Sequence, residues 1–253
     1  MGDRSAIEWT DATWNPVTGC DRVSDGCQQC YALALAKRLK AMGNPRYQTD
    51  GNPKSSGPGF GLTLHEDVLQ LPLRWASPRL VFVNSMSDLF HPRVPPSFIA
   101  RVFATMQLAS RHTFQVLTKR PERMMAVVRD VQPDPLPNVW LGTSIESDRY
   151  SSRADALRWT PAAVHFLSLE PLLGPLPSLD LNGIEWVIAG GESGHHHRPV
   201  DLAWVRDLRD RCQEAGVAFF FKQVGGVTPK AGGRSLDGRT WDEMPRPVVP
   251  AAG

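Results

Sequence analysis

Three of the four cysteines lie between positions 20 and 30, in the stretch TWNPVTGCDRVSDGCQQCY. Cys20, Cys27 and Cys30 form the pattern C-x6-C-x2-C. The residues before this stretch are typical of a strand, and residues 32–42 are typical of a helix. Clustered thiols in a chain of this size favour a metal over a disulfide framework, as expected in a reducing compartment. The spacing therefore predicts a metal site in one strand-to-helix loop.

Three hypotheses explain the three thiols. A structural zinc ion needs four ligands, and the fourth would be one of His195, His196 or His197. Without a metal, the thiols would pack together or exchange electrons with other thiols. An iron–sulfur cluster takes thiolates as its usual ligands, and three cysteines leave one iron without a protein ligand. An open coordination position is the mark of a catalytic metal site. The fourth cysteine, Cys212, falls near the buried face of a helical pattern and is expected to act as a small apolar residue.

The remaining sequence alternates short apolar runs with helical patterns. With 253 residues, 42% hydrophobic and 21% charged, the chain suits a single α/β barrel or doubly wound domain. The expected strands are 8–18, 62–65, 80–88, 113–120, 138–146, 164–170, 184–193 and 217–223. The expected helices are 32–42, 96–111, 121–130, 148–159 and 201–215. About eight strands with fewer helices predict an α/β fold, a TIM-like (β/α) barrel of parallel strands that is incomplete or irregular at its first and sixth crossovers. An open doubly wound sheet is the alternative.

Polar residues gather at the end of nearly every expected strand, and the ends of parallel strands meet at one edge. These residues are Asn84, Ser85, Asp88, Thr118, Lys119, Arg120, Thr143, Ser144, Glu146, Ser168, Glu170, Glu192, Ser193, Lys222 and Gln223. Residues two apart share a face of a strand, so Ser144 and Glu146 are expected to point the same way. The pattern predicts a polar pocket at this edge, next to the loop that carries Cys20, Cys27 and Cys30.

We expect residues 1–226 to form a single domain, with a flexible insertion loop at 43–61 and a C-terminal extension at 227–253. The N-terminal segment lacks the apolar core of a secretory signal, and no run approaches the roughly 18–20 residues of a membrane span. These features predict a cytoplasmic protein without a membrane partner. A net charge of +2 neither requires nor excludes a nucleic-acid partner.

The cysteine loop resembles a variant of the radical S-adenosylmethionine (SAM) motif, whose common form is C-x3-C-x2-C. More closely, the chain resembles a family of phage-encoded and bacterial three-cysteine proteins of this type. The resemblance extends over residues 9–226. It rests on TWNPVTGC, GCQQCYA, FVNSMSDLFH, VLTKRPERM, LGTSIES, SLEPLLGP, GGESG followed by Arg198-Pro199, and FFFKQVGG.

The resemblance implies a 4Fe-4S cluster held by Cys20, Cys27 and Cys30, with SAM on the open iron. Reductive cleavage of SAM, fed by an external electron donor, would give a 5′-deoxyadenosyl radical that acts on a substrate. The cofactor-binding residues would be Tyr31, Ser85, Asp88, Ser144, Glu146, Ser168, Glu170, Gly190, Gly191 and Glu192. The substrate-binding residues would be Lys119, Arg120, Arg198 and Lys222.

Two departures from the common motif stand out. Gln29 precedes the last cysteine where an aromatic residue is usual, and Gly190-Gly191-Glu192 ends the seventh expected strand instead of the second.

The substrate expected from this resemblance is a nucleic acid or a nucleotide. It follows from the phage association of the family and from a scatter of arginines at positions 93, 101, 111, 120 and 123. The alternative function is a non-catalytic iron–sulfur or zinc protein that binds nucleic acid. The sequence carries no signal for an oligomeric state.

Overall fold

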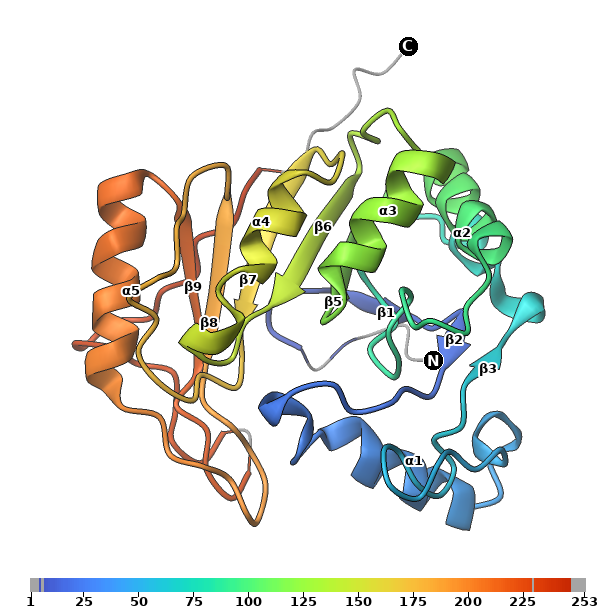
Figure 1. Ribbon diagram of the computed structural model, residues 1–253, viewed down its shortest axis with the longest axis horizontal. Helices are drawn as coiled ribbons and strands as arrows, with labels where there is room; N and C mark the ends of the chain where they lie inside the picture. The colour runs from blue at the N-terminus through green and yellow to red at the C-terminus, as the bar shows by residue number, and fades with distance from the viewer. Residues whose placement is uncertain (1–4, 6, 229, 247–253) are drawn as a thin grey trace.

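The computed structural model describes residues 5, 7–228 and 230–246, and its centre is an open parallel sheet (Figure 1). The described residues place seven strands in this sheet, in the order of the chain. They are β1 (Ala12–Trp14), β4 (Leu80–Val83), β5 (Thr113–Thr118), β6 (Val139–Ser144), β7 (Val164–Leu169), β8 (Trp186–Gly190) and β9 (Ala218–Gln223). All neighbouring strands are parallel. The sheet is a half-barrel, so the prediction of an incomplete TIM-like barrel is confirmed.

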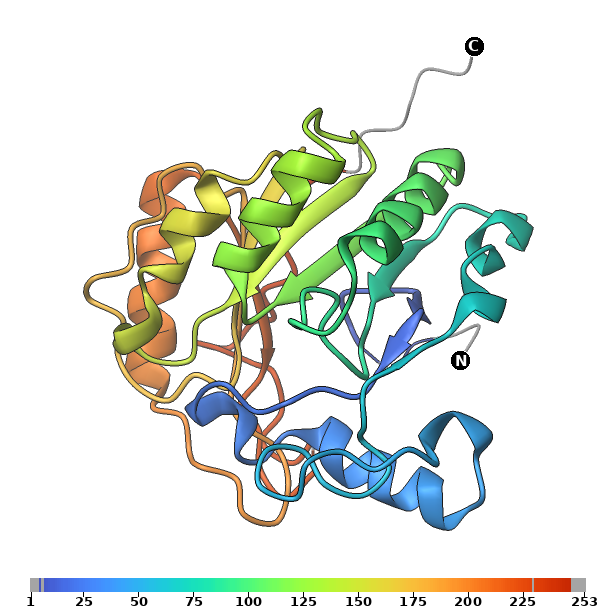
Figure 2. The same cartoon turned by 45° about the vertical axis from the view of Figure 1, so that its right-hand side comes forward.

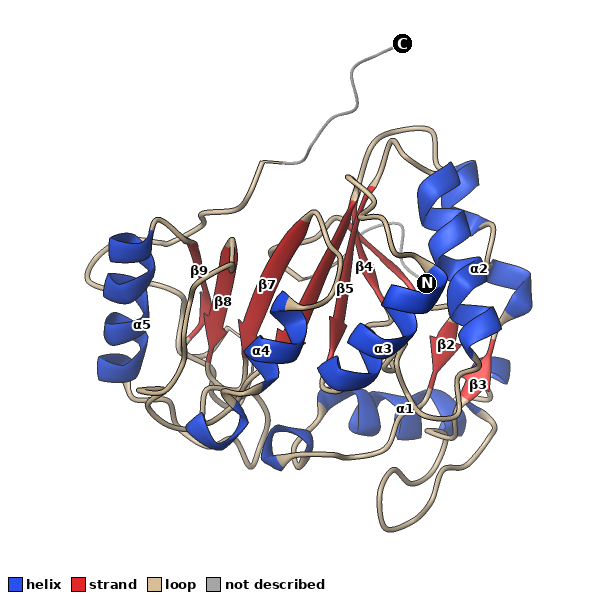
Figure 3. Ribbon diagram, turned by 45° about the horizontal axis from the view of Figure 1, so that its top comes forward, coloured by secondary structure: helices blue, strands red, loops and turns tan. Residues whose placement is uncertain are grey.

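Four helices cover one face of this sheet (Figure 3). They are α2 (Pro96–Leu108), α3 (Pro121–Val131), α4 (Arg153–Arg158) and α5 (Leu202–Ala215). Pro121 sits in the first turn of α3, the side chain of Asp201 caps α5, and Gly216 ends α5 with φ 67°. These are the start and stop signals that helices prefer. Because the helices share one face and the strand order never reverses, the doubly wound alternative is excluded.

The first crossover and the one from β7 to β8, which was the sixth in the expected set of eight strands, are irregular, as predicted. Helix α1 (Tyr31–Ala41) lies beyond the C-terminal ends of the strands instead of on the helix-covered face (Figures 1 and 2). The segment 170–185 between β7 and β8 contains no helix. Short 3-10 helices lie at Asp25–Cys27, Pro45–Tyr47, Glu66–Val68, Leu71–Arg74 and Asp148–Tyr150.

Two expected strands differ from the structure. The segment 62–65 is not a barrel strand, because β3 (Thr63–Leu64) pairs antiparallel with β2 (Val17–Thr18) in a separate two-stranded sheet. The expected strand 8–18 breaks into β1 and β2 at Asn15-Pro16, since a proline cannot donate to a strand ladder. The strands that form in these two segments are only two or three residues long.

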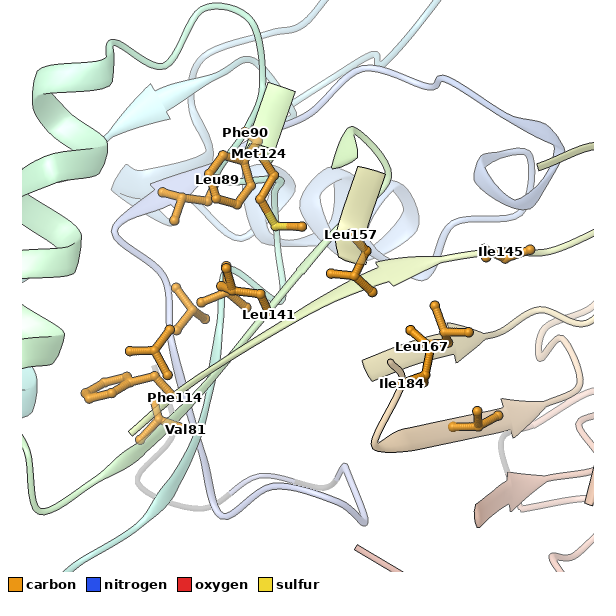
Figure 4. Packing of buried hydrophobic residues seen from close by; sticks show 14 of the residues in the cluster. Val81, Leu89, Phe90, Phe114, Met124, Leu141, Ile145, Leu157, Leu167 and Ile184 are labelled. Atoms are coloured by element: carbon orange, nitrogen blue, oxygen red, sulfur yellow. The ribbon is translucent and has the colours of Figure 1, made fainter. Parts of the chain in front are cut away.

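The two faces of the sheet have different cores because side chains alternate along each strand. On the helix-covered face, Phe114 and Leu141 pack with Met124 of α3 and Leu157 of α4 (Figure 4). The opposite face carries a mainly aromatic cluster of Trp9, Phe82, Trp140, Val164, Phe166, Trp186, Ile188 and Phe220. Its rings meet mostly edge to face, as between Trp140 and Trp186 at 5.9 Å. This opposite face, which is the inner face of the half-barrel, is therefore filled by aromatic side chains toward the start of the strands and carries polar side chains at their ends.

Residues 43–61 and the C-terminal segment both contact the domain. Lys40 forms an ion pair with Asp50 at 2.5 Å, which ties the insertion to α1. In the C-terminal segment, Trp241 packs against Phe219. The flexibility of residues 43–61 and the domain boundary at residue 226 stay predictions. Residues 1–4 and 6 of the predicted domain, and residues 229 and 247–253 of the predicted C-terminal extension, lie outside the described residues. Within the described ranges, no helix is long and apolar enough to cross a membrane.

Gly142 of β6 offers a test of the inner core. It pairs in register with Phe166 of β7, and a Cβ at position 142 would lie 2.6 Å from atoms of the Phe166 ring. Phe166 is fully buried and has no room to retreat. We expect Gly142→Ala to lower the free energy of unfolding by about 1–3 kcal/mol, the usual cost of overpacking. Chemical denaturation measures this change.

The control for this prediction is Gly174→Ala, because a Cβ there meets no atom within 4 Å. Equal stability of the Gly142→Ala variant and the wild type would contradict the described packing. Partial recovery by the second substitution Phe166→Leu would locate the clash at the ring.

Candidate metal and cofactor site

Cys20, Cys27 and Cys30 line one pocket of about 170 Å³ at the C-terminal edge of the sheet. All three thiols are free. Polar side chains from the ends of β4, β5 and β6 also line this pocket: Asn84, Ser85, Ser87, Asp88, Thr118, Lys119, Arg120 and Ser144. Apolar walls come from Val23, Leu33, Phe60, Phe82 and Leu117. We call this cavity the thiol pocket.

Local backbone geometry brings the thiols to the pocket. Gly19 turns the chain with φ 85°, and a Cβ there would lie 2.2 Å from the carbonyl oxygen of Gly61. Only glycine allows both the turn and this close approach. Cys27 ends a 3-10 helix, and Cys30 is the N-cap residue of α1. We call residues 19–30 the cysteine loop.

The surroundings of two thiols shift their pKa values. Burial raises the pKa of Cys20 to about 12; Asp88 adds to this effect and Arg120 opposes it. Burial also raises the pKa of Cys30, whereas the backbone amides of Ala32 and Leu33 at the start of α1 lower it. Among the described residues, no three His, Cys, Asp or Glu side chains are already arranged as a metal site.

Arg120, two residues after β5, binds the first part of the cysteine loop. Its guanidinium forms a largely buried ion pair with Asp88 at 2.7 Å. It also donates to Sγ of Cys20 at 3.5 Å and to the carbonyl oxygen of Asp21 at 3.0 Å. Asp88 accepts in addition from Thr118 Oγ1 at 2.8 Å. One arginine thus connects two strand ends to a thiol.

Glu146, two residues after β6, binds the middle of the loop. The residue is fully buried and accepts from the backbone N–H of Gly26 at 3.2 Å and from Arg153 at 3.0 Å. Burial acts to raise the pKa of its carboxyl, but Lys119, Ser24 and Arg153, with the Gly26 amide, hold that pKa below its ordinary value. Glu146 is therefore an ionised anchor for the loop backbone.

Arg198 binds the loop from the side of β8. It forms a two-pronged pair with Glu192, with nitrogen–oxygen distances of 2.8 and 2.5 Å. The same guanidinium donates to the carbonyl oxygen of Asp25 at 3.1 Å. Burial acts to raise the pKa of the Glu192 carboxyl, and the bonds from Arg198 outweigh that effect and lower it. Segments that follow three strands thus hold the loop at Asp21, Gly26 and Asp25.

The structure brings about half of the expected cofactor and substrate residues to the thiols. Those that line the thiol pocket are Tyr31, Ser85, Asp88, Lys119, Arg120 and Ser144. The Tyr31 hydroxyl donates to the carbonyl oxygen of Ser85 at 2.5 Å. Glu146 and Arg198 contact the loop backbone, Glu192 pairs with Arg198, and none of the three is among the residues that line the pocket. His195, His196 and His197, the candidate fourth zinc ligands, are absent from the lining that the described residues form.

The other expected residues lie further along the same edge. Lys222 pairs with Glu170 at 2.6 Å across β8, because Gly190 between them carries no side chain to separate them. Ser168 is the register partner of Ser144 on the neighbouring strand. Gly191 lies against the backbone of Val224, where a Cβ would be 1.9 Å from a carbonyl oxygen. The cofactor and substrate roles of all these residues stay predictions.

Sequence reasoning missed several residues of the site. Asn84 is not one of these, because it is among the expected polar strand ends and lines the thiol pocket, although no role was predicted for it. Asp21 forms a contact with His91 at 2.9 Å and accepts from Ser55 at 2.6 Å, and nothing in the spacing of these residues indicates either contact. Asp21 also lines a second cavity of about 310 Å³, together with Thr49, Asp50, Gly51, Asn52, Ser55, Gly61, Leu62 and Arg93.

The fold and the site together define a class: a parallel half-barrel that gathers three free thiols in a polar pocket at the C-terminal ends of its strands. The chain belongs to the family described as "Protein of unknown function (DUF5131)", which matches residues 4–245. No curated protein matches the chain.

Among solved structures, the chain is similar to one titled "Spore photoproduct lyase complexed with dinucleoside spore photoproduct". The sequence identity is 12% and the TM-score is 0.38. The match covers 78% of this chain and 59% of that chain. A likeness this loose carries no argument about activity.

We expect Arg198→Gln to loosen the cysteine loop, because glutamine cannot bridge Glu192 and Asp25 at once. In the metal-free protein, Cys27 should then react several-fold faster with iodoacetamide, as measured by mass spectrometry of its peptide. The buried Cys212 of α5 serves as an internal reference.

Arg206→Gln is the matched control for this experiment. Arg206 pairs with Asp237 at 2.9 Å and makes no contact with the cysteine loop among the described residues. An unchanged Cys27 rate in Arg198→Gln would mean that Arg198 does not restrain the loop.

Proposed function

We propose that this protein is an iron–sulfur radical SAM enzyme. Its expected reaction is the reductive cleavage of SAM, with electrons from an external donor, to act on a nucleic acid or nucleotide in the cytoplasm. The observation that carries the proposal is that Cys20, Cys27 and Cys30 line one pocket at the C-terminal ends of parallel strands. Such strand ends are where parallel α/β folds place their active sites.

The residues of the thiol pocket suit such a cluster. Three thiols are an all-sulfur donor set, which iron–sulfur clusters prefer. Arg120 donates to one of these sulfurs, and such donors stabilise the negative charge of a thiolate. Cys20, Cys27 and Cys30 would hold the cluster, and Tyr31, Ser85, Asp88 and Ser144 would contact SAM. When bound, the cluster would supply the single electron that SAM cleavage requires.

The protein's own side chains orient the ligands and keep out water. Phe60, Phe82 and Leu117 form apolar walls beside the thiols. The ion pair of Arg120 with Asp88 and the Glu146 bond to Gly26 set the position of the loop. Pre-organised groups of this kind contribute to catalysis because they do not have to rearrange during the reaction.

The proposed substrate class rests on exposed cations beside the pocket. Arg22 lines the thiol pocket, and Arg93 lines the neighbouring cavity. The Arg93 side chain is 60% exposed. Guanidinium groups bind phosphates well, so both side chains suit a nucleotide or nucleic acid. The alternative function is a non-catalytic iron–sulfur or zinc protein that binds nucleic acid. It would use the same two arginines, so an experiment is needed to distinguish it from the enzyme.

We expect Cys20→Ser, Cys27→Ser and Cys30→Ser each to lose most of the iron and sulfide after anaerobic reconstitution. Each change removes one of only three protein ligands. Cys212→Ala should keep a full cluster, because Cys212 is buried in α5 away from the pocket. Iron and sulfide assays and the visible absorption of the cluster measure the outcome.

Reconstituted wild-type protein decides between the two functions. Release of 5′-deoxyadenosine from SAM after reduction would support the enzyme, whereas a stable cluster that never cleaves SAM would support the non-catalytic alternative. One zinc and no iron in anaerobically purified protein would exclude a cluster.

We expect Arg120→Lys to lower the midpoint reduction potential of the cluster. A lysine keeps the positive charge, but its side chain is shorter than that of arginine, so its Nζ stops short of the position from which Arg120 Nη1 donates to both Asp88 and Cys20. A donor to a ligand sulfur stabilises the reduced, more negative cluster, so its loss makes reduction harder. A redox titration followed by electron paramagnetic resonance measures the shift.

Arg153→Lys is the control for this titration. Arg153 binds Glu146, and no contact with a thiol is seen in the described part of the chain. An unchanged or higher potential in Arg120→Lys, at normal iron content, would show that the Arg120 bond to Cys20 does not influence the cluster.

A further inference from the structure

Asn84 has an unusual position in the thiol pocket. It directly follows β4 and has a left-handed backbone conformation with φ 63°. Asparagine adopts this conformation more readily than most residues with a side chain. The residue is 2% exposed and lines the same pocket as the three thiols.

The hydrogen bonds of Asn84 determine which way its amide points. The backbone N–H of Val17 donates to Asn84 Oδ1 at 3.2 Å. Only the oxygen can accept from an N–H, so the orientation of the amide follows from this bond. The Nδ2 group is consequently on the other side, and it is buried without a hydrogen-bond partner among the described residues.

A buried amide donor without a partner is uncommon in folded proteins, where most such groups are satisfied. The Oδ1 bond and the left-handed backbone explain why an asparagine is suitable at position 84, but neither uses Nδ2. A ligand in the thiol pocket that presents an oxygen acceptor would satisfy this donor. The unpaired Nδ2 therefore points to a ligand-binding role.

The neighbouring charges indicate what kind of oxygen is bound. Lys119 lines the same pocket, and its ammonium group also attracts the carboxylate of Glu146. Ser144 adds a hydroxyl to the lining. An amide donor, an ammonium group and a hydroxyl together suit a carboxylate better than a neutral carbonyl.

We propose that Asn84 Nδ2, with Lys119, binds the carboxylate of the ligand in the thiol pocket. This inference rests on the proposed function, which makes that ligand SAM and the carboxylate its methionyl carboxylate. Decarboxylated SAM keeps the adenosyl group, the sulfonium and the amine and lacks only the carboxylate. The difference in affinity between SAM and decarboxylated SAM therefore measures the contacts of the carboxylate apart from all other contacts in the pocket.

The test is the affinity of reconstituted Asn84→Asp protein for SAM and for decarboxylated SAM, measured by equilibrium dialysis. Aspartate keeps the size, the left-handed preference and the acceptor for Val17, but it replaces the donor with a negative charge. We expect SAM binding to weaken about tenfold to a hundredfold, the worth of a hydrogen bond to a charged group. Binding of decarboxylated SAM should stay near the wild-type value. Lys119→Gln should show the same selectivity for the carboxylate.

An equal loss of affinity for SAM and for decarboxylated SAM, or an unchanged affinity for SAM, would overturn the inference. Asn84→Gly, which fits the left-handed backbone but lacks the amide, repeats the test if the aspartate variant unfolds. Iron content is measured in every sample, so failure of the proposed function appears separately, as wild-type protein without iron. Iron-loaded wild-type protein that does not bind SAM would overturn the inference while leaving the cluster in place.

Discussion

The structure depends on charged side chains that hold a loop by its backbone. Arg120, Glu146 and Arg198 come from the segments that follow β5, β6 and β8, and each binds a backbone group of the cysteine loop. Their charges are compensated in turn by Asp88, Arg153 and Glu192. An ion taken out of water has a large desolvation cost unless it is paired and hydrogen-bonded, so each anchor is stable only with its partner in place. The loop and the polar edge of the sheet are therefore one interdependent unit.

The aromatic cluster on the inner face explains why this unit forms at one end only. Trp140, Phe166 and Trp186 fill the half-barrel toward the start of the strands. Gly142 and Gly190 mark the level where bulky side chains end, and the next inward residues are polar. Along a single strand, the inward side chains thus change from packed aromatic rings to hydrogen-bonded polar groups. The aromatic part forms the core, and the polar part forms the candidate site.

Much of the fold could be predicted because parallel strands buried on both faces have a continuous apolar pattern. The polar strand ends were also visible, since they follow those runs directly. The local breaks were not, because residues 62–65 have the alternating pattern of a strand although only Thr63–Leu64 forms one, in a separate two-stranded sheet. The anchors of the loop could not be foreseen either. Glu146 and Arg198 are the residue types expected for ligands, and only three-dimensional contacts show them bound to Gly26 and Asp25.

An open half-barrel, unlike a closed one, has two edge strands with unpaired backbone groups, and such edges invite aggregation. One edge here is β1, which is only three residues long. At the other edge the C-terminal segment pairs antiparallel with β9: Phe221 donates to the carbonyl of Trp241, and Glu243 donates to that of Phe219. The C-terminal segment thus acts as a cover strand for the open edge of a barrel that does not close.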